Sequence, residues 1–131
     1  MKEPIWLELE DCIAIHEMML SQHGGLNGVR DYGLLESAVA KPRNRFAYEA
    51  AKVEDLAASY AAGVVLNHPF LDGNKRTGFL LAATFLELNG RVLTASEESV
   101  VEYTLALAAR SIGERGYALW LKANSKPVRT I

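Results

Sequence analysis

The first periodic segment of the chain spans residues 9–23. Six positions in it recur at three- and four-residue steps and so share one helical face: Leu9, Cys12, Ile13, His16, Leu20 and His23. Gly24 and Gly25 follow directly, and glycine readily adopts the left-handed backbone conformation that closes a helix. The pattern therefore predicts an amphipathic helix over residues 9–23.

The middle of the chain carries its most apolar stretch, over residues 53–67. Small and apolar side chains cover nearly every side of a helix there, which is typical of a central, buried helix. A second apolar helix is predicted over residues 75–88, where Asn89 and Gly90 end it. A polar segment, residues 68–76, separates these two helices.

A shorter helix is predicted before this pair, over residues 32–40. Asp31 is its expected N-cap, and Pro42 is expected to prevent its continuation because proline breaks the backbone hydrogen bonding of a helix. Residues 43–48 have no clear period. They are interpreted as a loop or a short β-hairpin.

The last third of the chain predicts two more helices. Thr94 and Glu97 have the spacing of a capping box, which would open a helix over residues 96–110, and another helix is expected over residues 114–123. Residues 91–93 are expected to be extended, and residues 125–131 to form a solvated tail. The predicted fold is all-α, with about six helices in a single compact domain spanning residues 1–131.

Composition and charge narrow the classes of function. The 131 residues fit one domain, since a domain usually takes roughly 100–200 residues. A formal net charge of -2 gives no overall basic field, so nucleic-acid binding is not expected. The single Cys12 cannot form an internal disulfide, which fits a reducing compartment. With no signal-peptide pattern and no apolar run near the length of a membrane span, a cytoplasmic protein without membrane association is expected.

Residues 68–76 place unusual polarity between two helices that are predicted to be buried. Five residues of types common in active sites lie in this segment: His68, Asp72, Asn74, Lys75 and Arg76. An unpaired polar or charged group inside a core costs several kcal/mol, so stability alone does not account for them. Two plainer interpretations stay open, namely a solvated helix start with local ion pairs and a structural histidine at a helix end.

The start of the predicted helix at residue 75 has the features of a phosphate site. Gly73 and Asn74 precede it, and glycine lets the backbone approach a ligand closely. The free N–H groups of the first helical turn and the helix dipole favour an anion at that place. Lys75 adds a point charge and Arg76 adds a planar fork, and both suit phosphate oxygens.

Two residues of the segment would make such a site reactive. Asp72 is a carboxylate beside these cations, and Mg²⁺, which usually accompanies ATP, takes oxygen ligands, so Asp72 is the candidate metal ligand. His68 carries an imidazole, the side chain that most often serves as a general base and takes a proton from an attacking hydroxyl. Pro69 and Phe70 are expected to fix and anchor the loop. Phosphoryl-type transfer relies on this kind of positioning and charge neutralisation.

The run from His68 to Thr77, HPFLDGNKRT, resembles the signature of the Fic/Doc family, His-x-Phe-x-Asp/Glu-Gly/Ala-Asn followed by an arginine, with a helix on each side. The resemblance to the Doc branch (death-on-curing toxins) extends over roughly residues 9–90. It includes four further segments: Gly24-Gly25-Leu26, Arg30-Asp31, residues 33–38 and residues 85–90. The resemblance implies the compact helical fold of that family.

Position 75 decides which reaction the resemblance implies. Fic proteins that transfer a nucleotidyl group have glycine where Lys75 stands, and usually a second arginine where Phe79 stands. A lysine side chain would crowd the hole that holds the inner phosphates. Doc-like proteins share this lysine, and a nucleotide bound in reverse there gives up its terminal phosphoryl group. The resemblance thus implies an ATP- and Mg²⁺-dependent protein Ser/Thr kinase that phosphorylates a translation factor, with elongation factor Tu expected, and halts translation.

By resemblance, His68 is the base, Asp72 the metal ligand, and Asn74, Lys75 and Arg76 bind phosphate. One alternative is a Fic-type nucleotidyltransferase that performs AMPylation of a protein hydroxyl. The other, from a different class, is a non-catalytic module that uses the anion site to hold a partner.

The Doc branch also implies an inhibitor and a docking element. Its toxins are paired with a Phd-like antitoxin, and the Ser/Thr-x-x-x-Glu-Gly/Asn helix of self-inhibiting Fic proteins does not occur in this sequence. The family places a target-docking flap near Arg43, Arg45 and Tyr48, although a solvated loop is an equal alternative there. His16 and His23 lack the spacing of a zinc-protease motif and are expected to be core or boundary histidines.

Overall fold

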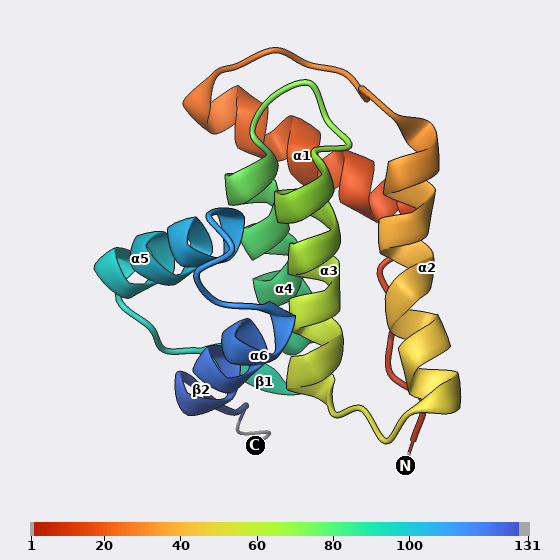
Figure 1. The fold of residues 1–131 in the computed structure, drawn as a ribbon, viewed down its shortest axis with the longest axis vertical. Coiled ribbons are helices and arrows are strands. Elements are labelled where there is room, and N and C mark those ends of the chain that lie inside the picture. The colour runs from red at the N-terminus through yellow and green to blue at the C-terminus, as the bar shows by residue number, and fades with distance from the viewer. Residues whose placement is uncertain (1, 129–131) are drawn as a thin grey trace.

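A computed structural model describes residues 2–128 and contains six α-helices and one small antiparallel sheet (Figure 1). The predicted all-α fold, with six helices, is therefore confirmed. None of the described helices is long and apolar enough to cross a membrane. In chain order the elements are α1 (Leu9–His23), α2 (Tyr32–Tyr48), α3 (Val53–Asn67), α4 (Asn74–Leu88), β1 (Arg91–Leu93), α5 (Glu97–Ala108), α6 (Glu114–Ala123) and β2 (Ser125–Pro127).

Helix α3 forms the centre of the molecule, because α2, α4 and α6 all pack against it (Figure 1). Its apolar residues are buried along almost its whole length, which explains why its sequence shows no polar face. The approach of α4 is close: a Cβ atom on Gly78 would lie 2.6 Å from Val65 Cγ2 and 3.0 Å from the Ala61 carbonyl oxygen. Glycine at position 78 therefore lets the two helices on either side of residues 68–73 pack directly together.

Helix α2 corrects the sequence-based prediction that a helix ends near residue 40. It continues through Pro42 to Tyr48, so the predicted loop or hairpin over residues 43–48 is wrong. Proline removes one backbone hydrogen bond, but Pro42 is itself buried, and tertiary contacts hold the turns that follow it. Phe46, for example, packs edge-on against Trp6 with ring centroids 5.7 Å apart. Such distant contacts are invisible to a local pattern.

The C-terminal part of the chain confirms the extended segment at residues 91–93 and corrects two details. Residues 125–127, predicted to be solvated tail, form β2 and pair with β1. Helix α5 is capped by Ser96, whose Oγ accepts a hydrogen bond from the Ser99 N–H, and not by Thr94. Thr94 instead donates from its N–H to the Asn124 carbonyl, 2.6 Å away, which joins the sheet region to the end of α6.

Candidate functional site

The polar segment at residues 68–73 is the connection between the end of α3 and the start of α4 (Figure 1). His68 caps α3 in the left-handed conformation, at φ 50° and ψ 58°, so the chain turns sharply at this residue. Arg30 holds the turn: its Nε donates to the His68 carbonyl at 2.6 Å and its Nη2 to the Asn67 carbonyl at 2.9 Å. The backbone of His68 is thus fixed while its side chain stays exposed.

A second loop, residues 24–31, lies along this connection and was not expected from local pattern. Val29 and Phe70 form an isolated antiparallel bridge, and the Leu71 N–H donates to the Gly28 carbonyl at 3.0 Å. Backbone pairing of this kind gives the loop after His68 a defined shape without a regular sheet. The Gly-Gly and Arg-Asp pairs noted in the sequence are parts of this supporting loop.

Asn74 secures the inside of the same loop. Its Oδ1 accepts from the Phe70 N–H and its Nδ2 donates to the Phe70 carbonyl, both at 3.0 Å, and the residue is buried. Phe70, predicted to be an anchor, is 1% exposed and stacks on His16 with ring centroids 3.9 Å apart. Both polar atoms of the Asn74 side chain are therefore hydrogen-bonded within the protein. The prediction that Asn74 binds phosphate rests on its backbone N–H.

The first turn of α4 presents free backbone donors. Gly73 is the N-cap in the left-handed conformation at φ 75°, which favours glycine, and a Cβ atom there would lie 2.1 Å from Met19 Cε, so the Met19 side chain would have to move. The Thr77 N–H bonds to the Gly73 carbonyl. Within residues 2–128, the N–H groups of Asn74, Lys75 and Arg76 have no acceptor. Free N–H groups at the start of a 15-residue helix form a site suited to an anion.

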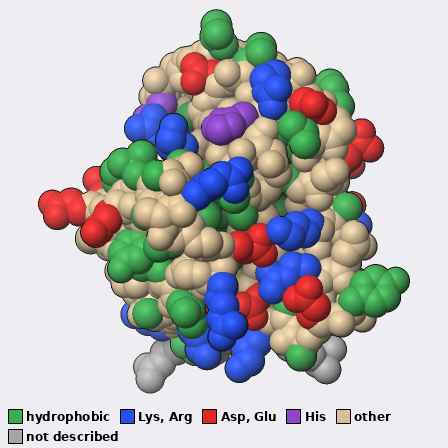
Figure 2. All heavy atoms as spheres, in the orientation of Figure 1, with side chains coloured by type: hydrophobic (Ala, Val, Ile, Leu, Met, Phe, Trp, Pro, Cys, Tyr) green, Lys and Arg blue, Asp and Glu red, His purple; other side chains and the backbone are tan. Residues whose placement is uncertain are grey.

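The charged side chains of this turn are available to a ligand. Lys75 and Arg76 are exposed and form no ion pair with any residue between 2 and 128. Figure 2 shows histidine and Lys or Arg side chains exposed on the upper part of the face, where Figure 1 places the α3–α4 connection. Unpaired cations beside free N–H groups favour a ligand that carries several negative charges.

Asp72 lies between His68 and the start of α4 in the chain. Its Oδ1 accepts from the Gly73 N–H at 2.9 Å and its Oδ2 from the Leu26 N–H at 3.2 Å. A carboxylate can accept about four hydrogen bonds, so each oxygen keeps a lone pair for a cation. A Cβ atom on Gly25 would lie 2.9 Å from Oδ2, so the supporting loop approaches the carboxylate as closely as glycine allows.

The described residues contain no group of three or more His, Cys, Asp or Glu side chains that could hold a metal ion. A cation at Asp72 would need further ligands from a substrate, which is the usual arrangement for Mg²⁺ with a nucleotide. His16 is buried, as predicted, whereas His23, at the end of α1, is exposed, so the prediction of a core or boundary position is wrong for His23. Burial raises the pKa of the Cys12 thiol to about 12, so this thiol stays neutral near pH 7 and is not a nucleophile.

The residues predicted to form a docking flap are not near the α3–α4 connection. Arg43, Arg45 and Tyr48 lie in the last turns of α2, at the lower end of the molecule in Figure 1, whereas the α3–α4 connection lies at the top. Arg43 pairs with Glu8 and stacks over the Trp6 ring. The prediction of a hairpin there is wrong, because the segment is helical. The Arg43 and Arg45 side chains make contacts within the helix bundle, whereas Tyr48 is 88% exposed.

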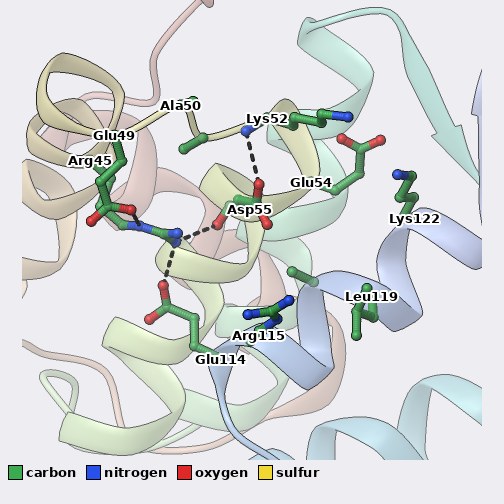
Figure 3. A pocket seen from close by; sticks show the side chains of 12 residues that line it. Arg45, Glu49, Ala50, Lys52, Glu54, Asp55, Glu114, Arg115, Leu119 and Lys122 are labelled. Atoms are coloured by element: carbon green, nitrogen blue, oxygen red, sulfur yellow. Dashed lines mark hydrogen bonds and ion pairs between the residues drawn. The ribbon is translucent and has the colours of Figure 1, made fainter.

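Arg45 belongs to a polar cluster at the first turns of α3, beside a cavity of about 580 Å³ (Figure 3). Its Nη1 donates to Glu114 Oε2 at 2.6 Å, to Ser59 Oγ at 2.7 Å and to the Asp55 carbonyl at 3.1 Å. Lys41 pairs with the other oxygen of Glu114. Arg45 and Glu114 therefore satisfy each other, which is typical of a structural cluster, whereas Lys52, Arg115 and Lys122, which also line the cavity, form no ion pair within residues 2–128.

Comparison with known proteins gives consistent matches. The sequence model of the Fic/DOC family matches residues 6–86. A protein named "Protein kinase doc", from Escherichia phage P1, is 35% identical over 106 residues, which cover 79% of this chain and 82% of the phage protein. A protein named "Toxin Doc", from Mycolicibacterium smegmatis, is 39% identical over 94 residues, which cover 69% of this chain and 68% of that protein.

Proposed function

This chain belongs to the Fic/DOC family, and we propose that it is a toxin that transfers the terminal phosphoryl group of ATP to a Ser or Thr hydroxyl of a translation factor. Elongation factor Tu is the expected target, and its phosphorylation would halt translation in the cytoplasm. The observation that carries the proposal is the start of α4. There the backbone N–H groups and the Lys75 and Arg76 side chains, which have no partners within residues 2–128, directly follow Asp72 in the chain.

This arrangement fits a nucleoside triphosphate with its divalent cation. The backbone N–H groups of Asn74, Lys75 and Arg76 would donate to phosphate oxygens, and the two cationic side chains would neutralise their charge. Asp72 would hold Mg²⁺ through the lone pairs that its two backbone partners leave free. When bound, Mg²⁺ would supply charge neutralisation at the phosphates.

His68 would act as the general base. Its side chain is exposed at the turn, and Arg30 fixes the backbone that carries it. The imidazole would accept the proton of the target hydroxyl as the hydroxyl oxygen attacks the terminal phosphorus. The bond from that phosphorus to the bridging oxygen breaks, ADP leaves, and the phosphate remains on the target as an ester.

Lys75 supports transfer of phosphate over transfer of nucleotide. It lies exposed in the first turn of α4, and its side chain would narrow the space for the inner phosphates of a nucleotide bound there. Phe79, where the nucleotidyl-transferring pattern usually has a second arginine, packs against the hydrophobic core and offers no charge. The phage relative carries the word "kinase" in its name, which favours the same reaction here.

The relatives are named as a toxin and as a kinase of the Doc type, so an antitoxin is the expected partner. We propose a Phd-like antitoxin, because residues 1–131 contain no self-inhibitory motif of the Fic type. The inhibitor would then come from another chain. Co-purification of the toxin with a co-expressed Phd-like protein, and recovery of cell growth, are the expected results.

An isotope experiment separates the proposed reaction from its alternative. The protein is incubated with purified elongation factor Tu and with ATP labelled either in the γ-phosphate or in the α-phosphate. Label retained only from the γ-phosphate, and a mass increase of one phosphate on the target, are expected. Retention of the α-label would instead establish AMPylation and overturn the kinase assignment. Absence of both, with a lysate as target, would favour a non-catalytic anion-binding module.

A further inference from the structure

His16, on α1, contacts the catalytic loop although it lies outside the loop's sequence motif. The residue is 1% exposed, and its ring stacks on Phe70 at a centroid distance of 3.9 Å with an interplanar angle of 7°. Its Nε2 lies 2.8 Å from the Asp72 carbonyl oxygen, 56 residues further along the chain. One buried side chain therefore touches both Phe70 and Asp72.

The hydrogen bond defines the state of the imidazole. A carbonyl oxygen can only accept, so Nε2 must carry a proton and donate it. Burial and stacking on Phe70 hold the ring in one orientation, so the donor is aimed at a fixed point. A phenylalanine at this position would fill the same space and stack in the same way. What histidine adds is the N–H donor.

This donor controls the peptide plane between Asp72 and Gly73. The chain contains no cis peptide bond among residues 2–128, and in a trans peptide the C=O and N–H point in opposite directions. Because His16 fixes the Asp72 carbonyl, it also fixes the direction of the Gly73 N–H. That N–H donates to Asp72 Oδ1 at 2.9 Å. The orientation of the imidazole is thus passed to the carboxylate through one rigid peptide.

We propose that His16 is a positioning residue that orients the Asp72 carboxylate for its divalent cation. The inference rests on the proposed role of Asp72 as metal ligand, and His16 itself touches neither substrate nor cation. Partners that orient a metal ligand are typically worth 10–100-fold in metal affinity. Since Leu26 also holds the carboxylate, through Oδ2, loss of the His16 donor is expected to weaken cation binding about tenfold, at the low end of that range.

Two amide substitutions, which differ in length by one methylene, separate the donor from the packing. In His16→Gln the amide nitrogen can occupy the place of Nε2, whereas in His16→Asn it reaches only the place of Nδ1, too far from Asp72. Both remove the ring and its stacking on Phe70. The dissociation constant of Mn²⁺ is measured by electron paramagnetic resonance in the presence of a non-hydrolysable ATP analogue. Thermal melting of each variant, without cation, reports the stability of the fold.

The expected result is that His16→Asn weakens Mn²⁺ binding about tenfold while His16→Gln stays within about threefold of the unsubstituted protein. His16→Phe, which keeps the stacking, should also weaken binding about tenfold. Equal Mn²⁺ affinity in the Gln and Asn variants would overturn the proposal, whatever their melting temperatures. In kinase assays the Mg²⁺ concentration for half-maximal activity should follow the same order.

Asp72→Asn distinguishes failure of this inference from failure of the proposed function. If Asp72→Asn leaves Mn²⁺ affinity unchanged, Asp72 is not the metal ligand and both proposals fall. If it abolishes binding but the His16 variants bind normally, the inference alone fails. Amide hydrogen exchange at Gly73 gives a readout without any cation: His16→Asn should exchange this N–H faster than His16→Gln. Identical exchange in the two variants would contradict the role assigned to the peptide plane.

Discussion

The two ends of α3 both carry charged residues, but they use them in different ways. At the N-terminal end, Arg45, Glu114 and Ser59 form a connected network beside a cavity of about 580 Å³ (Figure 3). At the C-terminal end, His68 and the first turn of α4 leave charged side chains and backbone N–H groups without partners among the described residues. The cavity therefore lies at the end where Arg45 and Glu114 are paired with each other.

The difference shows what identifies the functional end. A charge that is paired inside the protein has little attraction left for a ligand, whereas an unpaired charge beside free N–H groups binds an anion strongly. The backbone of the functional end is nevertheless tightly held, by Arg30, Asn74 and His16. Fixed backbone with free functional groups is the arrangement that positions a substrate without first reorganising the protein.

His68→Asn tests the functional end and has the largest expected effect. Asparagine tolerates the left-handed conformation that His68 adopts, so the turn should be kept while the base is lost. Phosphorylation of the target should fall by about 10²–10⁴-fold, the usual contribution of a general base. The melting temperature should stay within a few degrees of that of the unsubstituted protein. Full activity in this variant would remove His68 from the mechanism.

Glu114→Ala tests the N-terminal end of α3. It should lower stability without changing activity, the opposite of the result expected for His68→Asn. It leaves the partly buried Arg45 guanidinium without its carboxylate, and the free energy of unfolding should fall by about 1–3 kcal/mol. The value stays below that of a fully buried pair because Arg45 and Glu114 are 23% and 21% exposed. Chemical denaturation gives the stability, and kcat of the folded protein should be unchanged.

Lys41→Ala is the matched control for that experiment. Lys41 pairs with the same carboxylate, but its side chain is 50% exposed, so its loss should change stability by about 0.5 kcal/mol or less. A cost as large as that of Glu114→Ala would show that the cluster depends on its net charge and not on the Arg45 contact.

The double substitution Arg115→Ala and Lys122→Ala tests the cavity itself and has the smallest expected effect. Both side chains line the cavity, are exposed and form no ion pair within residues 2–128 (Figure 3). Surface changes of this kind usually alter stability by about 0.5 kcal/mol or less. Growth inhibition in cells and phosphorylation in vitro should both be retained. A tenfold loss of activity would mean that the paired end takes part in substrate recognition and that the comparison is wrong.

Local sequence pattern was sufficient for the helices that flank the catalytic loop. The apolar residues of α3 and α4, and the breaks at Asn67 and Asn89, depend on neighbours within a few positions, so periodicity located them to within one residue. It failed for α2, because the turns after Pro42 are held by Trp6 and Glu114, which lie far away in the chain. It also failed for residues 125–127, whose pairing with β1 is a distant contact.

By itself, the sequence determined the all-α fold, the position of the connection between α3 and α4, and the chemical types that the segment from His68 to Arg76 offers. Those properties follow from adjacent residues and from the periodicity of the α-helix. Only the tertiary structure decided which groups are free. In the folded protein, the Asn74 side chain bonds to the Phe70 backbone, and Arg45 belongs to a structural cluster. His16, from α1, bonds to the Asp72 carbonyl. Whether a polar group is free depends on every partner within about 3 Å, and those partners come from distant parts of the chain.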